Sequence, residues 1–303
     1  ARSTQVAGWF QSLGVQRGDK FMMMLDNEVE LWEAMLAAIK IGAVILPTTV
    51  MLAPEALASR IKRAGVNWVL TNQQNIHKFA ELSALGVDVA SLGRIATGTT
   101  VVKDTHRYAD AYASTEEFVV DGPTPADAEM LVYFTSGTTS EPKMVLHTQE
   151  SYSVGHFSTL YWLGVTAQDV HLNISSPGWG KHAWSSFFAP WIAGATVVAV
   201  NYARFDAATM LSVIEEFSVT SLCAPPTVWR MLIHADMGQV AAPPTNAVSA
   251  GEPLNLSTLE KVREAWGVTI RDGYGQTETT LQIATTPGLD VPAGALGTPL
   301  PGF

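Results

Sequence analysis

The chain has 303 residues, of which 47% are hydrophobic and 15% are charged, a composition typical of a globular protein with a large core. Its 18 lysines and arginines against 28 aspartates and glutamates give a net charge of −10, which argues against general nucleic-acid binding. The single cysteine, Cys223, excludes an internal disulfide and suits a reducing compartment, so we expect a cytoplasmic protein. The longest apolar region, Phe187–Val200, is interrupted by Pro190 and Gly194 and is too short to span a membrane.

The first third of the chain alternates between helical and strand-like patterns. Apolar residues at helical spacing predict a helix over Val29–Ile41 that ends at Gly42, and Ala43–Leu46 follows as a short strand. A proline at its start and a glycine after its end predict a helix over Pro54–Ala64, and Asn67–Thr71 is the next strand.

The same alternation continues to the end of the chain. Further strands are predicted at Met130–Phe134, His171–Ser175, Thr220–Ala224 and Val268–Arg271, and further helices at Ala183–Trp191, Phe205–Phe217 and Pro225–Ala235. Such alternation indicates an α/β fold with mostly parallel sheets flanked by helices. The polar stretch Ala96–Asp127 is the predicted passage between two lobes, so we expect a first α/β lobe over 1–127 and a second over 128–303.

Residues 133–143 follow a predicted strand and read Tyr-Phe-Thr-Ser-Gly-Thr-Thr-Ser-Glu-Pro-Lys. A hydroxyl-rich loop with a glycine hinge can direct N–H and O–H donors at a polyphosphate, and Lys143 adds a positive charge; a polar surface loop is the alternative. The stretch nearly fits the Walker motif, but Pro142 and Met144 replace its glycine and its hydroxyl residue. Because Pro142 has no N–H, we do not expect a helix N-terminus to hold the phosphates. The candidate phosphate-binding residues are Thr135, Ser136, Gly137, Thr138, Thr139 and Lys143.

This stretch resembles the phosphate-binding motif of the adenylate-forming family, which includes acyl-CoA synthetases, aryl-CoA ligases, luciferases and peptide-synthetase adenylation domains. Three further blocks are similar to family motifs in the same order, at Ser249–Pro253, Arg271–Glu278 and Gly297–Gly302. The resemblance extends over essentially the whole chain and is strongest towards medium-chain acyl-CoA synthetases. It implies the two-lobed large N-terminal domain of such an enzyme, with a leading segment before Ala1 and a small C-terminal domain after Phe303.

The resemblance also implies the reaction and its cofactors. A carboxylic acid and ATP would form an acyl-adenylate and pyrophosphate, and the acyl group would then pass to coenzyme A with release of AMP. The expected cofactors are ATP, Mg²⁺ and coenzyme A. The sequence does not identify the acid, the acceptor thiol or the oligomeric state.

Family roles carry over to individual residues of the matching blocks. Residues 135–139 and Lys143 would contact the β- and γ-phosphates, Thr277 the α-phosphate, and Glu278 would bind Mg²⁺, a hard cation that prefers oxygen ligands. Tyr274 would stack on adenine. The remaining nucleotide-binding candidates are Gly251, Glu252, Pro253, Asp272, Gly275 and Gln276. Glu252 is alternatively an exposed turn residue, and Asp272 a brace within its loop.

The block Ser176–His182 faces the acyl substrate in the family, so Trp179 would form one wall of the pocket, unless it is a core residue. Gly275 stands where acetate-specific relatives carry a bulky aromatic residue, which implies a longer or aromatic acid. Lys181 and His182 are expected at a helix start or at the surface.

Two other functions are compatible with parts of the sequence. Gly178–Ala183 fits the dinucleotide-binding pattern G-x-G-x-x-[GA], and Asp206 follows at roughly the expected distance, as in an NAD-dependent oxidoreductase. That pattern explains neither the loop at 135–143 nor the block at 271–278. A non-catalytic nucleotide-binding module is the second alternative.

Overall fold

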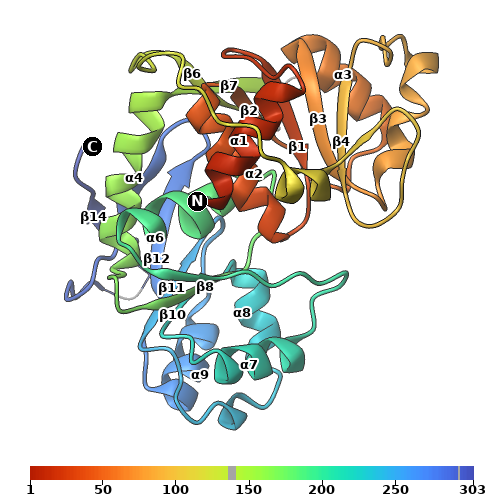
Figure 1. Ribbon diagram of the computed structural model, residues 1–303. Coiled ribbons are helices and arrows are strands. Elements are labelled where there is room, and N and C mark those ends of the chain that lie inside the picture. Colours follow the sequence, from red (N-terminus) through yellow and green to blue (C-terminus); the bar gives the residue numbers. More distant parts are fainter. Residues whose placement is uncertain (136–140, 293) are drawn as a thin grey trace. The chain divides into compact units, whose positions relative to one another are not determined.

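The computed structural model describes residues 1–135, 141–292 and 294–303, and the chain forms two compact units (Figure 1). The first unit comprises Ala1–Ser151 and Ser176–Trp179, and the second comprises Tyr152–Ser175 and Gly180–Phe303. In the part of the chain that the structure describes, no helix combines the length and apolarity needed to cross a bilayer.

The first unit is built on a seven-stranded sheet with the order β5-β4-β3-β1-β2-β6-β7. All neighbouring strands are parallel except β6 and β7, which form an antiparallel pair. The strands are β1 (Lys20–Met24), β2 (Val44–Pro47), β3 (Val66–Asn72), β4 (Gly93–Thr97), β5 (His106–Arg107), β6 (Glu129–Thr135) and β7 (Lys143–Thr148). The helices are α1 (Arg2–Ser12), α2 (Val29–Ile41) and α3 (Pro54–Ala64), with short 3₁₀ helices at Ile76–Phe79, Leu82–Leu85 and Tyr108–Ala113.

Strand β1 shows why this sheet is covered on both faces. Its sequence Lys-Phe-Met-Met-Met is apolar without alternation, as expected of a central parallel strand. The ring of Phe21 lies 5.1 Å from that of Phe10 on α1, whereas Met22 and Met24 belong to a buried cluster with Leu57 of α3. Helices α1 and α3 therefore pack on opposite faces of the sheet.

Helices α2 and α3 have the bounds predicted from the sequence. Helix α2 ends because Gly42 adopts the left-handed conformation at φ +85°, and α3 starts with Pro54 and ends at Gly65. These residues fix helix ends through backbone geometry, which is why their positions in the sequence predict the boundaries closely.

Strands β6 and β7 belong to the first sheet, whereas the sequence analysis assigned residues from 128 onward to a second lobe. The polar stretch 96–127, expected to connect the lobes, contains the end of β4, strand β5 and a 3₁₀ helix, and residues 112–119 contact α1. Gln5 donates to the carbonyls of Tyr112 and Ser114, and Gln11 donates to the carbonyl of Val119. Backbone carbonyls of this stretch accept hydrogen bonds from side chains of α1, and the whole stretch lies within the first unit, so it does not mark the boundary between the units.

The second unit contains another seven-stranded sheet, with the order β14-β13-β12-β11-β10-β8-β9. The five strands β12, β11, β10, β8 and β9 are parallel to one another. Strand β13 is antiparallel to β12, and β14 is antiparallel to β13. The strands are β8 (Val170–Asn173), β9 (Thr196–Val198), β10 (Ser221–Cys223), β11 (Asn246–Ala250), β12 (Arg271–Gln276), β13 (Thr280–Ala284) and β14 (Thr298–Pro299).

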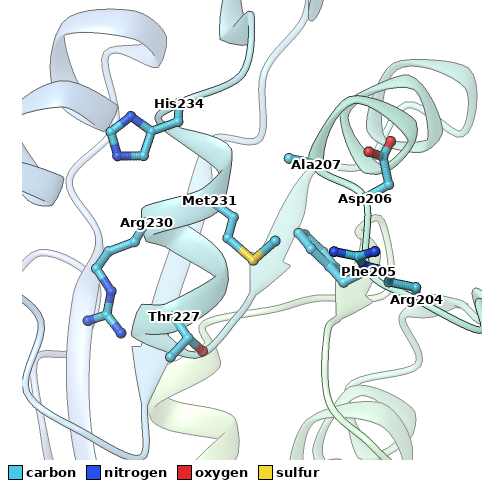
Figure 2. A pocket seen from close by; sticks show the side chains of 8 residues that line it. All are labelled: Arg204, Phe205, Asp206, Ala207, Thr227, Arg230, Met231 and His234. Carbon is cyan, nitrogen blue, oxygen red and sulfur yellow. The ribbon is translucent and has the colours of Figure 1, made fainter.

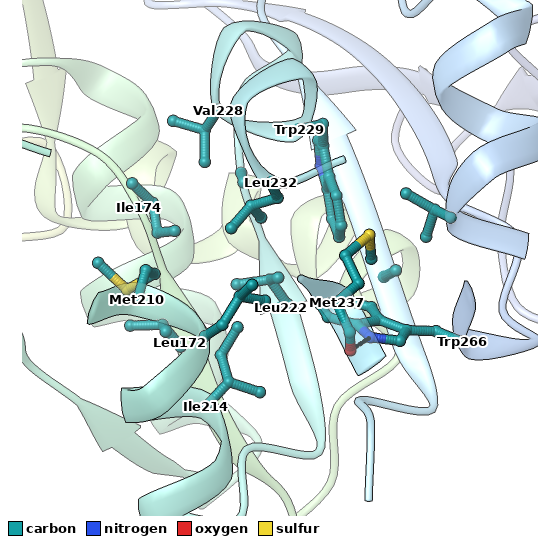
Figure 3. Packing of buried hydrophobic residues seen from close by; sticks show 14 of the residues in the cluster. Leu172, Ile174, Met210, Ile214, Leu222, Val228, Trp229, Leu232, Met237 and Trp266 are labelled. Atoms are coloured by element: carbon teal, nitrogen blue, oxygen red, sulfur yellow. Dashed lines mark hydrogen bonds between the residues drawn. The ribbon is translucent and has the colours of Figure 1, made fainter. Parts of the chain in front are cut away.

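The helices of this unit vary in length and type. They are α4 (Gln149–Leu163, whose first turn lies in the first unit), α5 (Gly180–Ala183), a π-helical turn at Trp184–Phe188, α6 (Ala189–Ile192), α7 (Ala207–Glu216), α8 (Pro226–Leu232), a 3₁₀ turn at Met237–Gln239 and α9 (Leu256–Trp266). One face of the sheet packs against α7, α8 and α9 around Leu222, Trp229 and Trp266 (Figure 3). The indole N–H of Trp229 donates to the carbonyl of Val248, and the indole N–H of Trp266 donates to the carbonyl of Met237.

The strand predicted at Val268–Arg271 was placed too early. Strand β12 begins at Arg271, which pairs with Val248 of β11, and continues through the sequence Gly-Tyr-Gly to Gln276. Ile270 is apolar because it is buried in the core, although it lies before the first residue of the strand.

Candidate active site

The phosphate-loop candidate joins β6 to β7. Ser136, Gly137, Thr138 and Thr139 lie outside the described residues, so the structure places only Thr135 and Lys143. Thr135 is the last residue of β6, Lys143 is the exposed first residue of β7, and the two are directly opposite in the ladder. A β-hairpin thus replaces the strand–helix arrangement of a Walker loop, in line with the expectation from Pro142.

The block at 271–278 forms one arm and the turn of the β12–β13 hairpin. Tyr274, in β12, is 43% exposed, so it is not a core residue, and its ring is accessible to a planar ligand. Thr277 and Glu278 occupy the turn, where Thr277 is half-buried and Glu278 is exposed. Thr280, at φ +64°, anchors the turn by donating to the carbonyl of Gly155 on α4 over 2.9 Å. The hairpin therefore holds an aromatic ring, a hydroxyl and a carboxylate at one end of β12.

Gly275 has a backbone reason to be glycine. A Cβ atom there would lie 2.2 Å from the carbonyl oxygen of Thr280 and 2.8 Å from Cα of Leu281, both in or beside the facing strand β13. This approach is too close for any side chain unless the hairpin shifts. The structure therefore gives a backbone reason for the glycine, and the enlarged acyl pocket stays a prediction that needs its own test.

Asp272 braces its loop. Its carboxylate accepts hydrogen bonds from the backbone N–H of Gly273 at 2.9 Å and of Leu254 at 3.4 Å, and burial raises the pKa of this carboxyl group. The bond to Leu254 ties β12 to the residue that follows the block Ser249–Pro253. This arrangement favours the structural alternative for Asp272 over direct contact with the nucleotide.

The block Ser249–Pro253 leaves the sheet at the end of β11. Gly251 is at φ +112°, a conformation that favours glycine, and Glu252 follows in the loop. The Glu252 carboxylate lies 3.9 Å from the Arg230 guanidinium, and both side chains are substantially exposed. Because β11 and β12 are parallel, this loop leaves the same edge of the sheet at which Tyr274 lies.

The block at 176–182 decides between the alternatives stated for three of its residues. Trp179 is 65% exposed, which excludes the alternative that it is a core residue. Lys181 and His182 lie at the start of a helix, α5, as one of the two expected alternatives had it. They are not surface residues, because the Lys181 Nζ atom is buried and burial lowers the pKa of His182 to about 3. Burial also lowers the pKa of Lys181, and the charges of Cys223 and Asp272 oppose this shift. Helical periodicity could not reveal this burial, because α5 has only four residues and a π-helical turn follows it at once, so no regular helical period extends over this block.

Sequence reasoning gave Arg271 no role, although it is the main polar link in this unit. Its guanidinium donates to the carbonyl oxygens of Trp162, Leu163 and Thr285 and to Oδ1 of Asn246. Burial lowers its pKa to about 10. The available signal was an arginine directly after the partly apolar stretch Val268–Ile270, since a buried guanidinium needs several acceptors.

The dinucleotide-binding alternative lacks its carboxylate. The Asp206 side chain caps α7 by accepting the N–H of Thr209 at 2.7 Å, so it performs a local structural role. Gly178, at φ +102°, is required by close approach to its own unit, because a Cβ there would lie 2.4 Å from the backbone nitrogen of Thr49. Neither residue needs a dinucleotide to explain it.

Among the described residues, no group of three or more histidine, cysteine, aspartate or glutamate side chains is arranged to hold a metal ion. A cation bound by Glu278 would therefore take most of its oxygen ligands from phosphates and water, which is how Mg²⁺ is commonly held beside a nucleotide. The exposed carboxylate of Glu278 fits this mode of binding.

Comparison with known proteins identifies relatives along the entire chain. The mouse (Mus musculus) acyl-coenzyme A synthetase ACSM3, named as mitochondrial, is 34% identical over 295 residues, which cover 97% of this chain and 50% of the relative. The 4-hydroxybutyrate–CoA ligase 1 of Metallosphaera sedula is 35% identical over 303 residues, which cover 99% of this chain and 52% of the relative. The chain thus spans about half the length of these relatives.

Solved structures agree with these sequence matches. The crystal structure of Brucella canis acyl-CoA synthetase has a TM-score of 0.87 and 27% identity, and the match covers 99% of this chain and 55% of that chain. An anthranilate CoA ligase solved with anthranoyl-AMP has a TM-score of 0.89 at 22% identity, which supports the fold alone. The sequence profile described as AMP-binding enzyme matches residues 1–303, and the chain therefore belongs to the AMP-binding enzyme family.

Proposed function

We propose that this chain is the nucleotide-binding part of an ATP-dependent acid–thiol ligase that forms acyl-CoA through an acyl-adenylate. The β12–β13 hairpin is the observation that carries the proposal. It presents Tyr274, Thr277 and Glu278 together, next to the strand that leads into the loop Gly251–Pro253. An accessible ring, a hydroxyl and a carboxylate in that order suit the base, α-phosphate and cation of bound ATP.

Adenylation solves a leaving-group problem. A carboxylate oxygen leaves poorly, whereas AMP leaves readily, but the anionic acid must first approach an anionic α-phosphate. Positive charge and hydrogen-bond donors fixed around the phosphates lower that barrier. Lys143 would contact the β- and γ-phosphates, and Thr277 the α-phosphate. Mg²⁺, when bound, would neutralise phosphate charge, and Glu278 would hold it in position.

The proposal is tested by ATP–pyrophosphate exchange in the longest natural form of the chain, because exchange reports adenylation without coenzyme A. Glu278→Gln keeps the side-chain shape and removes the charge that a hard cation needs. We expect exchange to fall sharply and to require more Mg²⁺. Glu264→Gln, on the exposed side of α9, is the matched control and should behave as wild type. An unchanged Mg²⁺ dependence in Glu278→Gln would show that this carboxylate does not hold the cation.

For the acid, we propose a medium-chain or aromatic monocarboxylic acid, supported by the exposed apolar surface of Trp179. The names of the relatives also make 4-hydroxybutyrate a compound to test. Each buried CH₂ adds about 0.8 kcal/mol of binding, so kcat/KM should rise about fourfold per carbon from acetate upward until the pocket ends. Trp179→Ala should flatten this series, whereas Trp191→Ala should not. A wild-type preference for acetate would contradict the proposed acid class.

The cytoplasmic location stays a prediction, since one relative is named as mitochondrial.

A further inference from the structure

One face of the second sheet is lined by polar residues although it is buried. Strand β8 contributes His171 and Asn173 to this face, and β10 contributes Ser221 and Cys223. The residues between them in sequence belong to the hydrophobic core on the opposite face. The π-helical turn after α5 covers the polar face, where the amide of Asn173 donates to Oγ of Ser186 at 2.8 Å. Each polar group in such an interior needs a hydrogen-bond partner.

Three polar atoms at this place are buried and have no hydrogen-bond partner in the described part of the chain. They are Nζ of Lys181 on α5, Oγ of Ser185 in the π-helical turn and Oδ1 of Asn173 at the end of β8. The three lie together, because the Cys223 thiol neighbours both Lys181 and Ser185, and Asn173 pairs with Cys223 in the β8–β10 ladder. A thiol is a weak hydrogen-bonding group, so it does not replace an oxygen partner for the lysine.

The unpaired atoms define the group that would satisfy them. Lys181 is a donor, Asn173 Oδ1 is an acceptor, and the Ser185 hydroxyl can be either. A hydroxyl group accepts from the lysine and donates to the amide oxygen, whereas a carbonyl oxygen would leave Asn173 unpaired. A carboxylate would leave it unpaired too, and would also be repelled by Asp272, whose charge already acts on Lys181. A hydroxyl therefore fits this place best.

The polar place adjoins the turn that carries Thr277. A Cβ atom on Gly180, the residue before Lys181, would lie 3.5 Å from Oγ1 of Thr277. Asn173 and Cys223 are the last residues of β8 and β10, and Thr277 follows β12, so all of them lie at the carboxyl ends of parallel strands in one sheet. An acid whose carboxylate meets the α-phosphate at Thr277 thus has this place within reach of its carbon chain.

The groove beside α8 makes no comparable demand for a ligand. It has a volume of about 800 Å³, and Figure 2 shows Arg230, Met231 and His234 along its helical wall. Among the described residues that line it, none has a buried polar atom without a partner. The Arg230 side chain is 42% exposed, so water hydrates it without a ligand. The unmet need for a polar partner lies in the interior beneath α5.

We propose that Lys181 and Asn173 bind a hydroxyl group on the carbon chain of the acid, so that the enzyme selects a hydroxy acid over the unsubstituted acid of the same length. The hydroxyl oxygen accepts from Nζ of Lys181 and its proton is donated to Oδ1 of Asn173. Lys181 then determines specificity and takes no part in the transfer of the acyl group. This inference rests on the proposed acid–thiol ligase, and it narrows the class of acid proposed for that reaction.

The test compares acids of equal carbon number by ATP–pyrophosphate exchange in the longest natural form of the chain. The probes are hexanoate, the positional isomers of hydroxyhexanoate, and the dicarboxylate adipate. In the wild type, kcat/KM for at least one hydroxyhexanoate should exceed that for hexanoate by about tenfold, the size of one hydrogen bond to a charged group. Lys181→Met keeps the side-chain length, removes the donor and should abolish this preference. Lys261→Met, at an exposed position on α9, is the matched control and should retain it.

Stability gives a readout that separates ligand binding from a structural role. Lys181→Met removes an unpaired amine from the interior, so its urea midpoint should be no lower than that of the wild type. A lysine retained for folding would instead lower the midpoint when it is replaced. The same hydroxyhexanoate should raise the Tm of the wild type more than hexanoate does, and this difference should disappear in Lys181→Met.

Several results would overturn the inference. Equal kcat/KM for hexanoate and all hydroxyhexanoates would mean that bound water, and not the acid, satisfies the three atoms. A wild-type preference for adipate, or a hydroxy preference that survives in Lys181→Met, would also refute it. If exchange occurs but hexanoate is preferred, the inference fails and the ligase stands. If no acid supports exchange, the ligase fails, and the Tm shifts still decide whether the place beneath α5 binds a hydroxy acid.

Discussion

Replacing Arg271 by methionine should destabilise the second unit severely. The guanidinium serves four acceptors, namely the carbonyls of Trp162, Leu163 and Thr285 and the side-chain oxygen of Asn246, with the bonds to Leu163 and Thr285 each 3.1 Å long. Arg271→Met leaves all four without this donor, at about 1 kcal/mol each at the low end of the range. Relief from burying a charge offsets part of this cost. We therefore expect a net loss of about 3 kcal/mol in the free energy of unfolding.

That loss corresponds to a fall in Tm of roughly 9 °C for a unit of this size. The assay is urea and thermal unfolding followed by circular dichroism and tryptophan fluorescence. Arg271→Lys keeps the charge but has only three donors on one nitrogen, so it should recover about half of the loss. Arg263→Met, at an exposed position on α9, should change stability by less than about 0.5 kcal/mol. If Arg271→Met unfolds within about 1 kcal/mol of the wild type, the four-acceptor account is wrong.

Three further changes test other parts of the structure. Lys143→Ala should weaken ATP binding by about 1.5–3 kcal/mol in calorimetry, while Lys103→Ala should leave it unchanged. Gly275→Ala should lower the urea midpoint because its Cβ would lie 2.2 Å from the Thr280 carbonyl oxygen, whereas Gly180→Ala should be tolerated because its nearest contact would be at 3.5 Å. Burial lowers the pKa of His182 to about 3, so between about pH 6.5 and pH 3 the imidazole binds a proton only in the unfolded chain. The free energy of unfolding should therefore decrease as the pH is lowered through this range. His182→Met should reduce that slope by about 1.4 kcal/mol per pH unit, measured by urea unfolding from pH 7 to 4.5, and an unaltered slope would contradict burial of a neutral imidazole.

The sequence predicted those features of the fold that depend on local backbone chemistry. Helices α2 and α3 were placed correctly because Gly42, Pro54 and Gly65 set their ends through allowed φ angles. The absence of a helix after Pro142 was likewise predicted from a missing N–H group, and the structure has a hairpin there. Membership of the AMP-binding family followed from ordered motifs and is confirmed.

Features that depend on distant partners could not be predicted in the same way. Lys181 is buried in α5, a helix of four residues that is followed by a π-helical turn, so there is no regular period from which its exposure could be judged. The stretch 96–127 was taken as a connection because nothing in its own sequence shows that Gln5 and Gln11 bind it. The role of Arg271 is defined by acceptors at positions 162, 163, 246 and 285, which no local pattern links.

Gly275 shows how one glycine can have two explanations that a single substitution does not separate. In the family comparison, a glycine in place of an aromatic residue implied that a wall of the acyl pocket is missing. In the structure, the same glycine is required because the backbone of Thr280 and Leu281 occupies the space of its Cβ. A substitution such as Gly275→Trp would therefore distort the hairpin that carries Thr277 and Glu278, and a loss of long-acid activity would not distinguish a filled pocket from a displaced catalytic turn. Trp179 is 65% exposed and belongs to the first unit, so the substitution Trp179→Ala removes a side chain without altering the backbone of the hairpin. Acid length should therefore be tested at Trp179, and the integrity of the adenylation site at Gly275.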